Sequence, residues 1–409
     1  MTQRPIRIGL LTLLLCLVSQ AQAQDGRYAL INGRIFDGVN ERIMENRTVL
    51  VAGDRIERIA PADAAIPAGY VLVDLEGYYL MPGLFDVHTH LETLAQARQA
   101  LESGVTTVRS ASVPAFQDVA LQQLVERGQL PGPEMVAAGV YVTPDLGDTV
   151  LADPRLAPLH GGVTSDDALR TLVSINADRG ARVIKTRGTE RAGLPETDPR
   201  QQVYTERQLR VVVDEAKRHG LPVMVHAHGD EGARAAVLAG ARSIEHGTYL
   251  SDETLALMKA RGTWFVPTYV TMDELNEERY DYVLRLRGKH MLPHLERAIR
   301  AGHAMGVRFA TGADHYYTED SINRISIEVE HFVRFGMRPF EALQAATTSS
   351  AELLGMEGRT GRIAEGFEAD LILLPDNPLT NVAALQDVLL VMSNGRIALK
   401  RIPFAVTEP

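Results

Sequence analysis

Apolar and polar positions alternate over short runs between residues 28 and 79. Runs rich in Val, Ile and Leu, such as YALINGRIF and RTVLVA, are followed by turn dipeptides, among them Asp37-Gly38 and Gly53-Asp54. A period of two interrupted by Gly and Asp is typical of antiparallel strands with one buried face. This part of the chain is therefore predicted to form a small β-domain.

Beyond residue 82 the pattern changes to short apolar runs that alternate with amphipathic stretches of helical period. Eight apolar runs are predicted as strands, at residues 83–87, 105–108, 134–140, 182–184, 222–225, 242–244, 263–266 and 307–310. The helices predicted between them include 91–101, 165–177, 205–219, 231–239 and 252–260. This order predicts an α/β fold, a (β/α)8 TIM barrel, although a doubly wound sheet would show the same alternation.

The last part of the chain returns to short alternating strands. They occur in GRIAEGFEADLILLP and DVLLVMSNGRIAL, with turns at Glu365-Gly366 and Asn394-Gly395. Because both chain ends share this pattern, we expect them to form one small β-sandwich with the barrel inserted between them. The predicted domains are 24–81 with 356–409 for the sandwich and 82–355 for the barrel.

The first 23 residues combine a basic start, an apolar stretch at residues 8–18 and the sequence Ala21-Gln22-Ala23. This combination is typical of a cleaved signal peptide, and the apolar stretch is shorter than the ~20 residues that span a bilayer. A membrane anchor is the alternative. We expect a periplasmic or secreted protein whose mature chain contains no membrane span.

Cysteine usage and charge exclude several classes of protein. The only cysteine, Cys16, lies within the predicted signal peptide, which leaves the mature chain without disulfides, thiol nucleophiles or cysteine-ligated zinc. The formal net charge is −10, with 42 basic and 52 acidic residues, and gives no electrostatic basis for binding nucleic acid. Small or peptide-like molecules are the expected partners, and the sequence leaves a homo-oligomer open.

Histidine, aspartate and lysine recur where the predicted barrel strands end. His88 and His90 are two residues apart, so both side chains face the same way in a strand. Later apolar runs are closed by Lys185, His226, His246 and Asp314. Each alone has an ordinary explanation, such as a helix cap, a packed histidine or a lysine that reaches solvent. Together at the carboxyl ends of barrel strands, where barrel active sites form, they predict a metal centre.

The motifs around these residues resemble those of the amidohydrolase superfamily. Its opening motif is similar to MPGLFDVHTH, its later metal-ligand motifs to VIK, VMVHAHG, SIEHG and TGAD, and its C-terminal segment to AATTSSAELLGMEGRTGRIAEGFEADLILLPDNPL. The resemblance covers residues 28–400 and is strongest to the branch of prolidase-like and imidazolonepropionase-like enzymes. That branch includes metal-dependent carboxypeptidases and ochratoxin-hydrolysing amidases.

The resemblance implies a site for two divalent metal ions, for which zinc is expected. One ion would be held by His88, His90 and Asp314, the other by His226 and His246, with Lys185 bridging them as N6-carboxylysine. A hydroxide between the ions would be the nucleophile, and Asp314 would carry its proton to the leaving amine. His228 is similar to a catalytic, substrate-contacting histidine of this branch, with support of a metal ligand as the alternative.

Three departures from the branch affect the expected substrate more than the reaction. Ser110 follows Arg109 where aspartate is usual, YVTPDLGD replaces a Gly-Gly-His stretch, and Thr186-Arg187-Gly188 replaces a serine with paired glycines. Arg109 and Arg187 are the candidates to bind a substrate carboxylate, although either can be an ion-paired structural residue. His315, next to Asp314, is expected to line the pocket.

These observations predict an exported amidohydrolase that cleaves N-acyl amino acids or dipeptides with a free C-terminal carboxylate. Hydrolysis of cyclic amides or lactones at the same site is one alternative, and a non-catalytic binding protein on this scaffold is another. A deaminase of the superfamily is disfavoured, because such enzymes carry a glutamate where this chain has Gly229.

Overall fold

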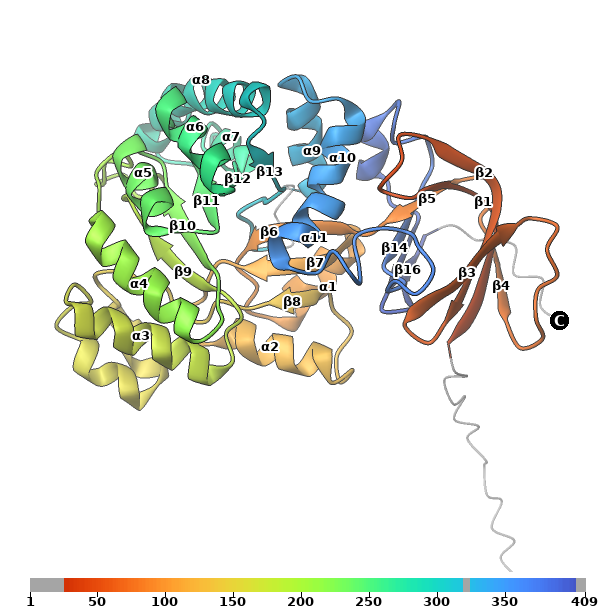
Figure 1. Ribbon diagram of the computed structural model, residues 1–409, viewed down its shortest axis with the longest axis horizontal. Helices are drawn as coiled ribbons and strands as arrows, with labels where there is room; N and C mark the ends of the chain where they lie inside the picture. The colour runs from red at the N-terminus through yellow and green to blue at the C-terminus, as the bar shows by residue number, and fades with distance from the viewer. Residues whose placement is uncertain (1–25, 319–323, 402–409) are drawn as a thin grey trace, which may run out of the picture.

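A computed structural model describes residues 26–318 and 324–401, and in it a barrel and a β-rich domain lie side by side (Figure 1). The predicted signal peptide and Cys16 fall outside the described residues. The predicted fold class, a TIM barrel with a small β-domain, is confirmed.

The β-domain joins the two ends of the chain in one sheet. Its strands are β1 (Arg27–Phe36), β2 (Ile43–Ala52), β3 (Arg55–Pro61), β4 (Val71–Asp74), β5 (Tyr79–Pro82), β14 (Leu371–Leu374), β15 (Leu390–Ser393) and β16 (Arg396–Lys400). The order is β16-β15-β14-β5-β1-β2-β3, and β4 pairs with the first half of β1 while β5 pairs with the second half. The chain ends meet where β5 pairs antiparallel with β14. Strands from both ends enclose one apolar core that includes Leu30, Val49, Leu371 and Leu390. The exact domain boundaries stay a prediction.

The barrel contains eight parallel strands. They are β6 (Leu84–Thr89), β7 (Val105–Ser110), β8 (Glu134–Val136), β9 (Ile184–Arg187), β10 (Val223–Ala227), β11 (Ser243–His246), β12 (Trp264–Val266) and β13 (Arg308–Phe309). They form the sheets β6-β7-β8 and β9-β10-β11-β12-β13. Two junctions close the ring, because Val142 N donates to Lys185 O at 2.9 Å and Asp314 N donates to His88 O at 2.7 Å. Because the ring of strands is closed, the fold is a barrel and not a doubly wound sheet.

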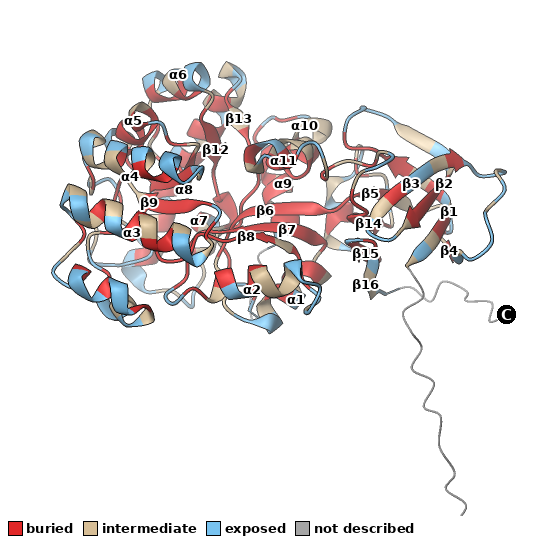
Figure 2. Cartoon of the chain, turned by 60° about the horizontal axis from the view of Figure 1, so that its bottom comes forward, coloured by how far each residue is buried: buried red, intermediate tan, exposed pale blue. Residues whose placement is uncertain are grey.

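Helices surround the barrel and turn their buried faces toward it (Figure 2). They are α1 (Leu94–Glu102), α2 (Gln117–Glu126), α3 (Asp166–Arg179), α4 (Glu206–Arg218), α5 (Asp230–Ala239), α6 (Asp252–Arg261), α7 (Tyr269–Glu274), α8 (Tyr282–Met305), α9 (Ile325–Arg334), α10 (Pro339–Ala345) and α11 (Thr348–Leu354). Short 3-10 helices occur at Gly147–Ala152, Pro154–Leu159 and Val382–Gln386. Among the described residues, no helix has the length and apolar character needed to cross a membrane.

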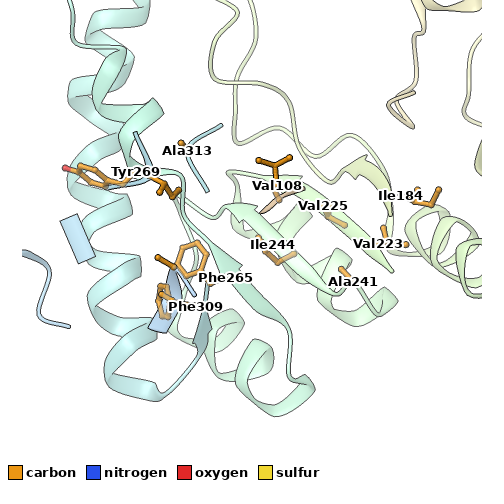
Figure 3. Packing of buried hydrophobic residues seen from close by; sticks show 14 of the residues in the cluster. Val108, Ile184, Val223, Val225, Ala241, Ile244, Phe265, Tyr269, Phe309 and Ala313 are labelled. Carbon is orange, nitrogen blue, oxygen red and sulfur yellow. The ribbon is translucent and has the colours of Figure 1, made fainter. Parts of the chain in front are cut away.

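Local sequence signals set the ends of these helices. At the start of α4, the Thr205 hydroxyl accepts from Gln208 N while the Gln208 side chain accepts from Thr205 N, which forms a capping box. Helices α5, α6 and α8 end at glycines with positive φ, a conformation that glycine adopts without steric cost. Inside this ring, Val225, Ile244 and Phe265 pack between the strands and the helices (Figure 3). The packed core holds the strand ends, and therefore the site, in fixed positions.

Candidate metal centre

The structure brings every predicted metal ligand to one cavity of about 650 Å³ at the carboxyl ends of the barrel strands. The cavity is lined by the predicted residues His88, His90, Lys185, His226, His228, His246, Asp314 and His315. Two groups have ligand atoms within 4.8 Å of one another: His88, His90 and Asp314 form one, and His226, His228 and His246 form the other. Lys185 Nζ lies 3.2 Å from His88 Nε2. The second group thus contains His228, which was predicted as a substrate contact.

Hydrogen bonds fix the orientation of the imidazoles. Nδ1 of His88 lies 2.8 Å from Glu245 Oε2, and Nδ1 of His90 lies 2.7 Å from Ser112 O. The imidazoles of His228 and His246 are hydrogen-bonded to threonine hydroxyls. Nδ1 of His228 lies 2.9 Å from Thr248 Oγ1, and Nδ1 of His246 lies 2.7 Å from Thr268 Oγ1. In each case Nδ1 is engaged and Nε2 is the nitrogen that could bind a metal, with the Nε2 atoms of His88 and His90 lying beside Lys185 and Asp314.

His226 has the opposite orientation, because its Nε2 lies 3.0 Å from Glu190 O and its Nδ1 is left for a ligand. A metal ligand must present an unprotonated nitrogen, and burial provides this state. Burial lowers the pKa of His88 to about 4 and that of His228 to about 3, and lowers the pKa values of His226 and His246 well below 6.5. The four rings are therefore neutral near pH 7.

Lys185 and Asp314 have charge states that suit a metal site. Burial lowers the pKa of Lys185 to about 8, which raises the fraction of neutral amine able to react with carbon dioxide. Burial also raises the pKa of Asp314, but the neighbouring imidazoles of His88 and His90 outweigh it and hold that pKa well below its usual range. Asp314 is thus a carboxylate, with Oδ1 3.0 Å from His90 Nε2. This donor set fits divalent metal ions.

Two of the candidate ligands have left-handed backbones. The φ angle is 73° at His246 and 51° at Asp314, and such positions cost about 1–3 kcal/mol for residues other than glycine. In a regular strand Glu245 and His246 would face opposite sides. The left-handed backbone at His246 instead turns this side chain toward the cavity, although Glu245 next to it contacts His88 from within the barrel. Part of the backbone strain of the described residues thus lies at the candidate site.

Arg109 lies beneath the cavity. It is 2% exposed, donates to Glu245 Oε1 at 2.9 Å and Val87 O at 2.6 Å, and does not line the cavity. Arg187 is likewise outside the lining and pairs with Glu190 at 3.0 Å. Neither guanidinium therefore lines the cavity, and binding of a substrate carboxylate by either stays a prediction that these positions do not favour. The alternative of an ion-paired structural residue describes both.

Glu245→Gln is expected to lower the free energy of unfolding by about 3–5 kcal/mol, because Arg109 would keep a buried charge without its carboxylate partner. Urea unfolding of the wild type and the variant measures this loss. Glu190→Gln is the control, since the Arg187–Glu190 pair is partly exposed and its loss should cost about 1 kcal/mol or less. Equal losses in the two variants would contradict the buried-pair argument.

The sequence did not single out several residues of the cavity wall. They are Glu92, Arg191, Met272, Arg279, Tyr280 and Tyr316, whereas Tyr141 begins the YVTPDLGD stretch already linked to the substrate. Tyr316 stacks on the ring of His90 with centroids 5.1 Å apart. Most of these residues lie in loops after strands, where no periodic pattern marks a residue as functional. Tyr316 alone carried a local signal, because it stands two residues after Asp314.

A closed barrel with this ligand set at the carboxyl ends of its strands defines a metal-dependent hydrolase. The sequence profile of the Amidohydrolase family matches residues 79–398, and the chain belongs to this family. A second profile, that of the NagA composite domain, matches residues 27–80, the part that contains β1–β4. The protein is accordingly a metal-dependent enzyme that hydrolyses amide bonds.

Known proteins are similar over nearly the whole chain. Ochratoxinase of Aspergillus niger is 27% identical over 388 residues, which cover 83% of this chain and 79% of the ochratoxinase. The crystal structure of a Xaa-Pro dipeptidase with methionine bound in its active site matches with a TM-score of 0.82 and 26% identity, over 91% of this chain and 99% of that one. A prolidase complexed with N-methylphosphonate-L-proline matches with a TM-score of 0.78 and 26% identity, over 92% and 100%.

Proposed function

We propose that the protein is an exported amidohydrolase with two metal ions, which cleaves N-acyl amino acids or dipeptides that carry a free C-terminal carboxylate. The observation that carries this proposal is the pair of ligand groups in one cavity, with Lys185 beside His88. We propose zinc as the metal and N6-carboxylysine at Lys185 as the bridge. Two divalent ions bound there would polarise the scissile carbonyl and lower the pKa of a bound water to about 7.

The side chains of Asp314, His228 and Glu245 have separate roles in the proposed reaction. Asp314 is a carboxylate whose side chain is 20% exposed toward the cavity, so it can accept a proton from the attacking water and deliver it to the leaving nitrogen. His228 has its Nδ1 engaged by Thr248, and its Nε2 is left to contact the scissile carbonyl or a metal. Glu245 holds His88 in one orientation from below.

The relatives support the substrate class. The Xaa-Pro dipeptidase holds the amino acid methionine in its active site, and the prolidase holds a proline derivative. Both bound molecules suggest that amide substrates with a C-terminal amino acid fit this fold. Cyclic amides and lactones are alternative substrates for the same set of groups.

Two further features bear on the proposal. A Cβ atom at Gly229 would lie 2.4 Å from Arg200 O, so the glutamate of the related deaminases does not fit at this position. This argues for hydrolysis of an amide over deamination. Export rests on the basic, apolar and Ala-Gln-Ala pattern of residues 1–23.

A substrate screen tests the proposal. The metal-loaded enzyme would be incubated with N-acyl amino acids, dipeptides, lactams and lactones, and the products measured by mass spectrometry together with the metal content. Release of free amino acids by a protein with about two metal ions per chain is expected. Turnover of lactones alone would favour the cyclic-substrate alternative, and bound metal without turnover would favour a binding protein.

A further inference from the structure

One loop carries a cationic side chain to the wall of the cavity. Arg191 lies in the segment between β9 and α4, and it lines the cavity together with Ala192, Gly193 and Leu194. Its guanidinium carbon lies 5.3 Å from the centre of the Tyr141 ring, and Lys185 Nζ lies 5.8 Å from the same centre. The ring of Tyr141 thus contacts both the lysine of the metal centre and Arg191. Arg191 is therefore close to the place where an amide bond would be cleaved.

Both Arg191 and Tyr141 present donors that lack an acceptor. Within residues 26–318 and 324–401, no carboxylate forms an ion pair with Arg191. The Tyr141 hydroxyl is buried and has no hydrogen-bond partner among the same residues. The other arginine of the cavity wall differs, because Arg279 pairs with Glu274 and with Glu277 at 3.1 Å. Arg191 is thus the guanidinium whose charge is left for a ligand.

The loop around Arg191 is held in place by a second arginine. Arg287 on α8 donates to four carbonyl oxygens of this loop, those of Ala192, Leu194 and Thr197 at 2.6 Å and that of Pro195 at 3.1 Å. A loop fastened in this way keeps Arg191 at one position before a ligand arrives. Less conformational entropy is then lost on binding, which favours affinity and selectivity.

We propose that Arg191, supported by the Tyr141 ring, binds the carboxylate of the substrate's C-terminal residue and makes the enzyme select free acids. This inference rests on the proposed function. The carbonyl carbon of the scissile amide and the carboxylate carbon of the following residue are three bonds apart, about 4 Å at most. A substrate held at the metal centre therefore places its carboxylate near the Tyr141 ring. A guanidinium can grip both carboxylate oxygens in parallel, which gives selectivity as well as affinity.

The test compares one N-acyl amino acid with its C-terminal amide, which differs only in the charged group. For Arg191→Gln we expect kcat/KM for the free acid to fall roughly 10- to 100-fold, because the variant loses a charge-assisted hydrogen bond to the carboxylate. We expect kcat/KM for the amide to stay within about twofold, because the amide has no carboxylate to lose. Arg191→Lys should fall between the wild type and Arg191→Gln, because lysine keeps the charge but loses the two-pronged geometry. Arg191 is exposed, so its replacement should leave the fold intact.

Arg279→Gln is the matched control, since this arginine lines the cavity but its charge is already paired. It should leave the preference for the free acid unchanged. An Arg191→Gln variant that loses activity equally on acid and amide, or on neither, would overturn the carboxylate assignment.

Calorimetry of the metal-loaded protein separates this inference from the proposed function. The free acid should bind the wild type roughly 10-fold or more tightly than the amide, and this difference should vanish in Arg191→Gln. If neither compound is hydrolysed but the difference in binding is seen, the proposed function fails and the carboxylate subsite stands. If hydrolysis occurs without any difference in binding, the subsite is wrong and the proposed function stands.

Discussion

Replacing Asp314 by asparagine is expected to lower kcat about 1,000-fold or more while the protein stays folded. The variant loses the carboxylate that accepts the proton of the attacking water, and loss of a positioned general base costs about 100- to 10,000-fold. Asparagine has nearly the same shape and tolerates a left-handed backbone, which Asp314 adopts at φ 51°. Steady-state kinetics and thermal unfolding of the same preparations measure the two effects separately.

Glu92→Gln is the control for Asp314→Asn, because Glu92 is a second carboxylate of the cavity wall and belongs to neither ligand group. It should keep kcat within about tenfold, the range of a peripheral electrostatic effect. Metal content must be measured for both variants, since Asp314 is also a candidate ligand. Retention of more than about a tenth of kcat by metal-loaded Asp314→Asn would assign the proton transfer to another group.

The barrel and the placement of its candidate ligands at one cavity were predictable because their signals are local. Apolar runs with helical linkers follow from the periods of strand and helix, and a residue that closes a run lies at the strand end whatever surrounds it. His88, His90 and Lys185 all lie in the described strands β6 and β9 or directly after them. The profile match over residues 79–398 agrees with the motifs that carried the resemblance.

The support beneath the site was not predictable in the same way. Glu245 contacts His88 from the inner side of the strand, and His246 faces the cavity as well because its backbone is left-handed, a turn that no alternation rule anticipates. For Arg109 the sequence leaves both a substrate contact and an ion-paired structural residue open, because an arginine at a strand end is compatible with either role. Its partner, Glu245, is 136 residues away in sequence, and only the closed barrel brings the two together.

The long helix α8, which lies between two predicted strands, has weaker local signals than the helices that the sequence analysis names by range. It contains Pro293 and Gly288, which ordinarily interrupt a helix. Its apolar face is buried nonetheless, with Met291, Leu295 and Ile299 packed into the barrel core. Tertiary packing outweighs the unfavourable local propensity here. Helix α8 also affects the site, because its Arg287 donates hydrogen bonds to the loop that carries Arg191.

Lys185→Ala is expected to lower kcat/KM by about 1,000-fold or more and to reduce the metal content from about two ions to about one per chain. Lys185 is the residue placed beside His88 and, through Tyr141, beside the substrate subsite. Without its side chain, the proposed bridge between the two ligand groups is lost. A short carboxylic acid such as propionate should restore part of the activity, because its two oxygens can take the place of a carbamate. Intact-mass analysis of the wild type should detect the added mass of one carbon dioxide.

Lys217→Ala is the control that distinguishes loss of the proposed bridge from loss of one positive charge. Lys217 lies in the last turn of α4, on the outer ring of helices, and does not line the cavity. It should keep full activity, both metal ions and the carbon dioxide adduct. Bicarbonate should speed the recovery of metal-depleted wild-type enzyme, because the amine of Lys185 must react with carbon dioxide before it can bridge. Lys185→Ala should show no such effect. A fully active Lys185→Ala variant, or a wild type that holds two metal ions without the adduct, would leave the six other cavity groups to hold the metal and would remove the carbamate from the proposed site.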